Sequence, residues 1–323
     1  MFYGDHGSDT IIKLCGRPDC MHNNADCNAF FNRGCSICYY DGHLYTVQRM
    51  SDYRNHELIR MDLDGTNRIS VVDTREIGTG FDGSTMHLVW NGIFSLGLIS
   101  LNENGEEITD MYYYRLNGSM DGLEPANMGL PCANDGDHFL VYCTGPDGNL
   151  GYSRWEHQAQ EVTYLTDVGA EGYYGIEDAW YILDGVIYHD VYEEAGPQAV
   201  FDTGLRGYKR LYCYPDCLVV SDSVSMEDKL AGAELNTIEL NFYNWNFEHL
   251  GQVELDYPRS SNFVNVICGE TPDRIILTDS ASFYPRYYIE KSEFGTGNIE
   301  IHAYNLPDLI EELSELDEQL EDR

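Results

Sequence analysis

The chain has 323 residues, with 19 Lys and Arg against 55 Asp and Glu, and its formal net charge is −36. Nucleic acids and anionic membrane surfaces bind clustered Lys and Arg, so this balance argues against both as partners. The hydrophobic share of 43% suffices for a folded core, and the apolar runs are too short to span a membrane.

The first six residues contain neither a basic start nor an apolar stretch, so we expect no export signal here. The densest group of chemically active side chains follows in a Cys/His-rich loop, residues 14–31. Cys15, Cys20, His22 and Cys27 form a Cys-x4-Cys-x-His-x4-Cys array. Three thiolates and one imidazole are the ligand set of a closed structural zinc site, which is one interpretation of this loop.

Two other interpretations of the loop stay open. Its cysteines could form disulfides among themselves or with Cys35 and Cys38, or they could be buried thiols without a special role. The Cys35-x-x-Cys38 motif lacks the βαβ surroundings of a thioredoxin-type redox site. Zinc ligation, disulfides and buried thiols without a special role therefore all stay open for the loop, and we expect zinc or disulfides to hold it together.

Short apolar and aromatic runs bounded by Gly, Asp, Asn and Pro dominate the rest of the chain, which is typical of many short strands. One unit recurs, in which a turn pair such as Asp-Gly precedes an alternating strand. Its copies start near residues 40, 90, 135, 183, 214 and 271. Their mean spacing of roughly 45 residues is close to the length of one four-stranded propeller blade.

These six copies predict an all-β fold: a β-propeller of about six four-stranded blades in a single domain over residues 1–305. A β-sandwich or two smaller β domains are the alternative. The last repeat is short of an outer strand, and residues 10–14 could supply it, because a blade built from both chain ends leaves no free sheet edge.

Residues 306–323 carry leucines at 3-4 spacing, which predicts a short acidic amphipathic helix. A helix on the side of the propeller or a loose tail is favoured over an oligomer zipper, so we expect a monomer.

The remaining cysteines offer weaker signals. Cys213 and Cys217 bracket a turn and could form a disulfide in an oxidising compartment. Cys132 and Cys143 are similar candidates, and Cys268 lies in an apolar run that is typical of the core.

Carboxylate pairs raise the alternative of a carbohydrate-active hydrolase or lyase, because glycosidases use two such groups. Candidates are Glu177 with Asp178, Glu193 with Glu194, and Asp279. With 55 acidic residues, however, pairs arise by chance. The chain has no nucleophile elbow, phosphate loop or His-Glu-x-x-His motif. A non-catalytic binding protein is therefore the leading interpretation.

Aromatic residues are the other surplus, with 25 Tyr, 12 Phe and 4 Trp. The tryptophans fall in different repeat units, as expected for a repeated packing position. Tyr152, Tyr173 and Tyr174 lie beside glycines and are candidates for a rim that stacks on a glycan or peptide, with packing in the core or a turn as the alternative.

The loop and the first repeat together resemble a family of uncharacterised bacterial propeller proteins, which includes lipoproteins and propellers similar to the low-density-lipoprotein-receptor type. The residues that carry the resemblance are Leu14-Cys15, Pro18, Cys20, His22, Cys27-Asn28-Ala29 and Tyr40-Asp41-Gly42-His43-Leu44-Tyr45. The match is good over about residues 10–70 and extends beyond only as a repeat pattern. From the first residues we expect neither the family's export signal nor its lipid-bearing cysteine in this chain.

The family has no settled activity, so the resemblance implies a propeller fold and an extracytoplasmic, envelope-associated setting rather than a function. We therefore expect an extracytoplasmic binding or interaction propeller, with a glycan or peptide as its ligand.

Overall fold

The computed structural model describes most of the strands and several of the turns between them. The described residues are 2–4, 8–15, 20, 27–29, 37–50, 55–76, 83–89, 92–116, 124–125, 130–135, 138–146, 148–156, 161–167, 172–193, 195–223, 237–256, 266–278 and 285–305. Helical structure in these residues is limited to two short turns, η1 (Thr74–Glu76) and η3 (Lys291–Glu293). None of the described helices has the length and apolar character needed to cross a membrane.

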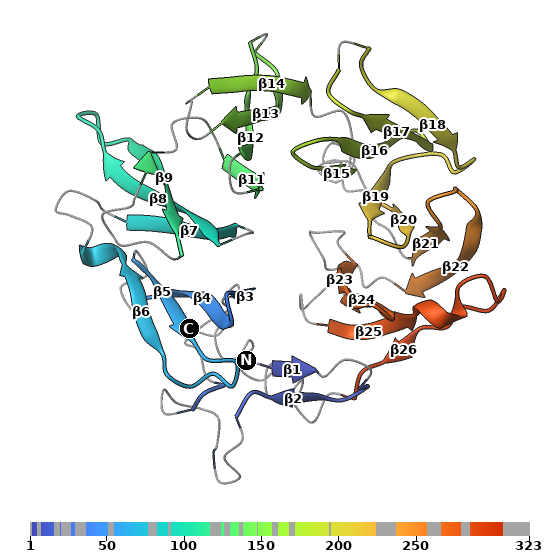
Figure 1. The fold of residues 1–323 in the computed structure, drawn as a ribbon, viewed down its shortest axis with the longest axis horizontal. Coiled ribbons are helices and arrows are strands. Elements are labelled where there is room, and N and C mark those ends of the chain that lie inside the picture. The colour runs from blue at the N-terminus through green and yellow to red at the C-terminus, as the bar shows by residue number, and fades with distance from the viewer. Residues whose placement is uncertain are drawn as a thin grey trace. The chain divides into compact units, whose positions relative to one another are not determined.

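The chain divides into two compact units. The first comprises residues 1–2 and 13–168, and the second comprises residues 3–12 and 169–323. Each unit contains three four-stranded antiparallel sheets, and in each sheet the strands lie in chain order (Figure 1).

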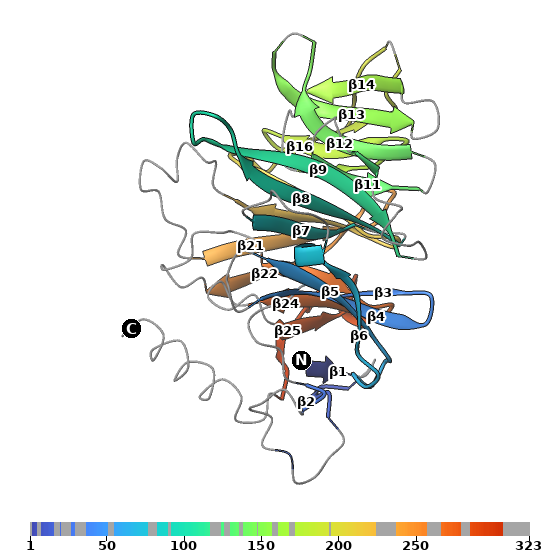
Figure 2. The same cartoon turned by 90° about the vertical axis from the view of Figure 1, so that its left-hand side faces the viewer.

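The sheets of the first unit are formed by consecutive strands. The first sheet consists of β3 (Ile37–Tyr40), β4 (His43–Arg49), β5 (His56–Met61) and β6 (Ile69–Asp73). The second consists of β7 (Gly83–Val89), β8 (Ile93–Leu101), β9 (Glu107–Arg115) and β10 (Glu124–Pro125). The third consists of β11 (Leu130–Asn134), β12 (His138–Thr144), β13 (Leu150–Glu156) and β14 (Glu161–Asp167). Figure 2 shows β7, β8 and β9 side by side.

The second unit repeats this plan. Its first sheet consists of β15 (Gly172–Tyr174), β16 (Ala179–Leu183), β17 (Val186–Asp190) and β18 (Gln198–Asp202). The next consists of β19 (Lys209–Cys213), β20 (Leu218–Asp222), β21 (Thr237–Tyr243) and β22 (His249–Asp256). The last consists of β23 (Ile267–Glu270), β24 (Arg274–Thr278), β25 (Pro285–Glu290) and β26 (His302–Ala303).

Neighbouring sheets of the first unit pack face to face through apolar side chains. One core joins Tyr45 and Leu58 of the first sheet to Phe94 and Tyr114 of the second. A smaller core joins the second sheet to the third, and its members are Tyr113, Phe139, Val141 and Trp155. Burial of these aromatic and branched side chains supplies the main driving force for holding the sheets together.

The second unit packs in the same way. Ile182 and Ile187 of its first sheet share a core with Leu218 of the next sheet. The opposite face of that next sheet packs, through Phe242, against Ile275 of the last one. Four-stranded antiparallel sheets that pack face to face in series are the repeat of β-propellers, so the prediction of an all-β propeller fold is confirmed at this level.

The turn signals locate one hairpin in each of the four-stranded sheets. Asp41 and Gly42 both have positive φ, 46° and 77°, as a two-residue turn between β3 and β4 requires. The repeat copy at Asp184-Gly185 has the same geometry, with φ of 46° and 80°, but it joins β16 to β17. The first turn of that sheet is instead Gly175–Asp178. The repeat copy in this sheet therefore marks the second hairpin rather than the first, which explains the short interval before the next copy.

The N-terminal segment differs from the expectation. β1 (Phe2–Gly4) and β2 (Ile11–Lys13) form a two-stranded sheet of their own. The last sheet has four strands without them, because β26 provides the outer strand that the sequence pattern does not reveal. The two chain ends nevertheless meet: Thr10 forms a parallel bridge with Asn305, and the Ile11 N–H donates to the Asn305 carbonyl at 3.2 Å.

Arg274 also links the N-terminal segment to the last sheet. This arginine is only 6% exposed. Its guanidinium donates to the Ser8 carbonyl and to the Glu290 carboxylate, and it lies 4.0 Å from the centre of the Tyr288 ring. The predicted C-terminal helix at 306–323 lies outside the described residues.

Candidate functional site

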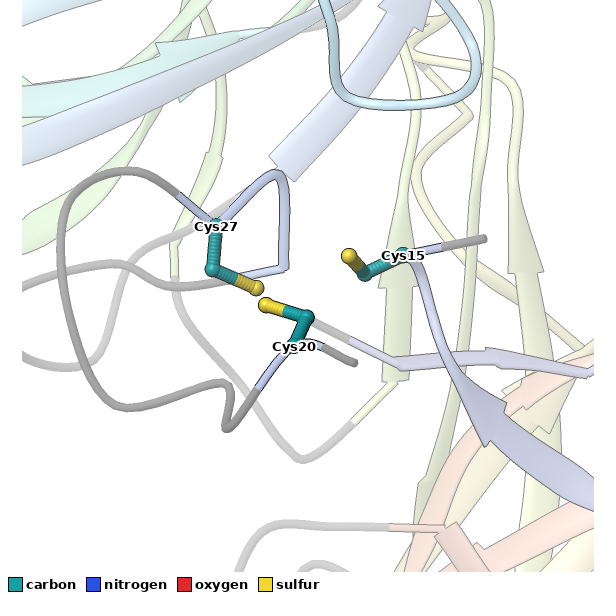
Figure 3. Close-up of side chains that lie close together, drawn as sticks. All are labelled: Cys15, Cys20 and Cys27. Atoms are coloured by element: carbon teal, nitrogen blue, oxygen red, sulfur yellow. The ribbon is translucent and has the colours of Figure 1, made fainter. Parts of the chain in front are cut away.

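Three cysteines of the predicted zinc loop converge in the first unit. Cys15 follows β2, and Cys20 and Cys27 lie further along the loop, none of them in a helix or strand. Their sulfur atoms all lie within 4.8 Å of one another and point toward one another (Figure 3). Cys27 is buried, whereas Cys15 and Cys20 are half-buried. The group could therefore hold a metal ion.

The backbone around Cys27 is held by the turn between β5 and β6. Arg68 donates to the Cys27 carbonyl at 3.3 Å and also to the Asn28 carbonyl. Gly65 in the same turn approaches Asn28 so closely that an added Cβ would lie 2.8 Å from the Asn28 oxygen. The position of the Cys27 thiol is thus tied to the first four-stranded sheet.

The surroundings of Cys27 bear on its charge state. Burial raises the pKa of the Cys27 thiol, and the neighbouring thiols of Cys20 and Cys15 raise it further. The Ala29 N–H donates to the Cys27 sulfur at 3.3 Å and opposes these effects. A bound cation would favour the thiolate form of all three side chains.

The remaining residues of the predicted cysteine and histidine sites are not all described by the structure. His22, the expected fourth zinc ligand, and Cys35 lie outside the described residues. Cys38 lies in β3 and is half-buried. Cys143 contacts the Ser153 hydroxyl, with sulfur and oxygen 3.2 Å apart. The side chain of Cys132 is outside the described structure.

The expected disulfide between Cys213 and Cys217 is not formed. Both are free thiols, and burial raises the pKa of each to about 12. Their side chains pack into different cores, Cys213 beside Leu218 and Ile182 and Cys217 beside Val219 and Phe242. These cores lie on opposite faces of the sheet β19–β22, so the side chains point apart. Cys268, expected in the core, is exposed.

A second candidate site lies in the second unit and consists of Asp178, Trp180, His189 and Trp245, hereafter the Trp180 cluster. The indole of Trp180 stacks on the His189 ring with centroids 4.0 Å apart and planes at 16°. One oxygen of Asp178 accepts a hydrogen bond from Trp180 Nε1 at 2.9 Å and contacts His189 Nε2 at 2.8 Å. The carboxylate therefore fixes the orientation of both rings.

Strand register explains why these side chains meet. The Asp184-Gly185 turn makes Trp180 of β16 the direct partner of His189 of β17. Tyr173 of β15 is the partner of Trp180 on its other side. Side chains of paired residues share a face of a sheet, so Tyr173, Trp180 and His189 form a row across three strands.

The neighbouring sheet contributes the last member of the cluster. Trp245 lies in the turn between β21 and β22 and approaches Trp180 edge-on, with centroids 5.1 Å apart and planes at 79°. Its Nε1 donates to the Tyr214 carbonyl at 2.9 Å. Trp245 is 37% exposed and Tyr173 is 50% exposed, so aromatic surface remains open to solvent on both sides of Trp180.

The three predicted rim tyrosines fall in two different units of the chain. Tyr173 and Tyr174 are adjacent in β15 and point to opposite faces, and Tyr174 stacks on Tyr181 with centroids 6.0 Å apart. Tyr152 belongs to β13 in the first unit and packs edge-on against Tyr142. Their binding role stays a prediction.

Trp180 and Trp245 are not recognisable as a site from the sequence, in which the four tryptophans indicate one repeated packing position. The structure gives the tryptophans unlike surroundings, since Trp155 is buried between two sheets while Trp245 lies in an exposed turn. The cross-strand pairing of Trp180 with His189 could have been found by counting outward from the Asp184-Gly185 turn.

Most of the candidate carboxylate pairs are incomplete in the described structure. Glu177 is exposed beside Asp178, and Asp178 is engaged by two rings. Glu194 and Asp279 lie outside the described residues. The Asp178 carboxylate contacts the rings of Trp180 and His189.

Comparisons with known proteins support the fold but identify no family for this chain. No family model and no curated protein matches the chain. Among solved structures, an uncharacterised protein from Listeria monocytogenes shares 10% identity over 86% of each chain, with a TM-score of 0.50. The SapL1 lectin, solved with α-methyl fucoside, shares 10% identity over 86% of this chain and 97% of that one, with a TM-score of 0.41. The β-propeller domain of the Trilobed protease from Pyrococcus furiosus shares 8% identity over 85% of this chain and all of that one, with a TM-score of 0.38.

Proposed function

We propose that this chain is a non-catalytic binding propeller whose ligand, a glycan or a peptide, stacks on the exposed aromatic surface of Trp245 and Tyr173. The supporting observation is the Trp180 cluster, in which one carboxylate orients two aromatic rings between two exposed ones. Aromatic rings that are fixed in advance lose little conformational freedom when a ligand stacks on them.

The polar part of the cluster suits a hydroxyl-rich or amide-rich ligand. The contacts of the Asp178 carboxylate with Trp180 and His189 use the same oxygen, Oδ2, and among the described residues no donor reaches Oδ1. That oxygen can accept a hydrogen bond from a sugar hydroxyl or a peptide N–H while the apolar face of the ligand covers an indole. This combination of an aromatic face and a polar acceptor is typical of small-ligand sites.

A carbohydrate-active hydrolase or lyase is the alternative function. It needs two carboxylates that flank the bond to be cleaved. In the described residues, the Asp178 carboxylate has hydrogen bonds to the rings of Trp180 and His189 and to no second carboxylate.

The finer features of the scaffold belong to the same proposal. We expect about six blades in a single ring over residues 1–305, a helix at 306–323, a monomeric state and an extracytoplasmic location. A structural zinc ion held by Cys15, Cys20, Cys27 and His22 completes it, and the role of His22 rests on the sequence pattern alone.

A ligand screen tests the proposed function. The intact chain is applied to a glycan array and a peptide library, and the affinity for each hit is then measured by calorimetry for the wild type, Trp245→Ala and Tyr173→Ala. Loss of one stacking ring should weaken binding about tenfold.

The matched control is Tyr39→Ala, which removes a tyrosine that is 65% exposed in the first unit. This variant should bind like the wild type. Turnover of any chromogenic glycoside, or hits that both aromatic variants bind unchanged, would overturn the proposal.

A further inference from the structure

We infer that Cys15, Cys20 and Cys27 form a thiolate site for one zinc ion, and that this ion fastens the N-terminal loop to the turn between β5 and β6. The inference deepens the zinc site named in the proposed function. It concerns the first unit and does not depend on ligand binding at the Trp180 cluster.

The number of converging sulfur atoms is the first argument. A disulfide joins two sulfur atoms at about 2.05 Å and would leave the third cysteine unused. Zinc–sulfur bonds of about 2.3 Å in a tetrahedron place the sulfur atoms about 3.8 Å apart. Three sulfur atoms within 4.8 Å of one another fit the second arrangement, and one coordination position remains for a further ligand.

The chemistry of the donor set is the second argument. Although the chain has 55 acidic residues, this is the one group of three or more His, Cys, Asp or Glu side chains with converging ligand atoms in the described parts of the chain. It contains sulfur alone. Thiolates select soft ions such as zinc over calcium or magnesium, which prefer oxygen.

The hydrogen bonding around Cys27 is the third argument. The Ala29 N–H, two residues along the chain, donates to the Cys27 sulfur. A backbone N–H directed at a sulfur stabilises the charged thiolate and orients the ligand, as outer hydrogen bonds do at metal sites. The chain here is bent so that a donor already faces the sulfur.

The contact between the Cys27 backbone and the β5–β6 turn indicates a structural role for the ion. Cys15 and Cys20 lie in loop positions, whereas the Cys27 backbone is held by Arg68 and by the close approach of Gly65 to Asn28. An ion that binds all three sulfur atoms therefore joins the loop to the β5–β6 turn. On binding, each thiol transfers its proton to solvent and its sulfur lone pair to zinc, with no change of oxidation state.

The test uses the intact chain, purified under reducing conditions, with zinc as the probe. Metal analysis should give close to one zinc per chain, and cobalt substitution should give the absorption bands of tetrahedral thiolate coordination. Alkylation mapped by mass spectrometry should show that zinc slows the reaction of Cys15, Cys20 and Cys27 and leaves the rate at Cys268 unchanged. This measurement needs no variant and so does not depend on a mutant folding.

Variants then localise the ion. Cys15→Ser and Cys20→Ser should lose the bound zinc, and the control Cys268→Ser should keep it. The inference is overturned if the reduced wild type takes up no zinc, if zinc leaves the alkylation rates of the three thiols unchanged, or if the double variant Cys15→Ser/Cys20→Ser retains a full equivalent. It is also overturned if two of the three cysteines are found in a disulfide after reducing purification.

Discussion

The thiol cluster of the first unit and the Trp180 cluster of the second are held in place by different means. Trp180 and His189 occupy paired positions of two strands, so the backbone hydrogen bonds of the sheet bring their rings together. Cys15, Cys20 and Cys27 lie outside helices and strands, and the Cys27 backbone accepts a hydrogen bond from Arg68 of the β5–β6 turn. The aromatic site is therefore built by the fold itself, whereas we propose that the thiol site is completed by a bound ion.

Removal of zinc is expected to have the largest effect and to be confined to the first unit. A ligand present at 1,000 times its dissociation constant stabilises the folded state by about 4 kcal/mol. A chelator should lower the free energy of unfolding by up to that amount and increase hydrogen exchange in the β5–β6 turn. Equal loosening of β16 and β17 would contradict the separation of the two sites.

Truncation of Trp180 should have the next largest effect, in the second unit alone. Trp180→Ala removes a half-buried indole that contacts His189, Trp245 and Asp178, and we expect a loss of about 3 kcal/mol in chemical denaturation. Trp180→Phe keeps an aromatic ring but loses the hydrogen bond, at about 1 kcal/mol. Zinc content should be unchanged in both variants, and a drop would show that the sites are coupled.

Gly65 and Gly105 lie in similar turns. Comparing their alanine variants separates the free-energy cost of backbone strain from the cost of displacing Asn28. Gly65 and Gly105 have φ of 77° and 79° and each donates its N–H to a residue three positions earlier. Gly105→Ala meets no atom within 4 Å and should cost about 1 kcal/mol from the left-handed conformation.

Gly65→Ala should cost about 1 kcal/mol more, because its Cβ would lie 2.8 Å from the Asn28 oxygen. It should also weaken zinc binding, as measured by competition with a chelator. Equal stability and equal zinc affinity in the two variants would argue that the β5–β6 turn does not position Cys27.

Alkaline pH should lower the free energy of unfolding of the second unit by a smaller amount that grows with pH. Burial, with a contribution from Asp190, raises the pKa of Tyr181 from 10.0 to about 12. The unfolded chain loses this proton near pH 10 while the folded chain keeps it. Stability that is fully present below pH 10 is therefore lost as the pH rises to about 12, by about 1.4 kcal/mol per pH unit from this group.

Denaturation curves between pH 9 and 12 measure this effect. Tyr181→Phe should show a shallower decline than the wild type, and the exposed control Tyr39→Phe should follow the wild type. Identical slopes for Tyr181→Phe and the wild type would show that Tyr181 ionises without unfolding.

Local signals in the sequence locate one hairpin in each four-stranded sheet, and Asp-Gly is the clearest of them because it has few conformational alternatives at a two-residue turn. They place the start of the sheet β15–β18 one hairpin late, since its first turn, Gly175–Asp178, lacks that dipeptide. They miss the outer strand β26 because it is only two residues long and carries no alternating pattern.

The two sites are predictable to different extents because one depends on spacing along the chain and the other on how two sheets pack. Spacing along the chain suffices to suggest that Cys15, Cys20 and Cys27 share an ion, since a short loop can bring them together. The contact of Trp245 with Trp180 depends on how two sheets pack, and nothing local to either tryptophan specifies it.

Arg274 has a practical consequence for handling the protein. Its buried guanidinium relies on a carbonyl from Ser8, more than 250 positions away in the sequence. Proteolytic trimming past Ser8 would leave a buried cation with one acceptor fewer, a change that costs stability although no apolar core residue is touched. Intact-mass measurement of the N-terminus should therefore accompany any comparison of melting temperatures between preparations.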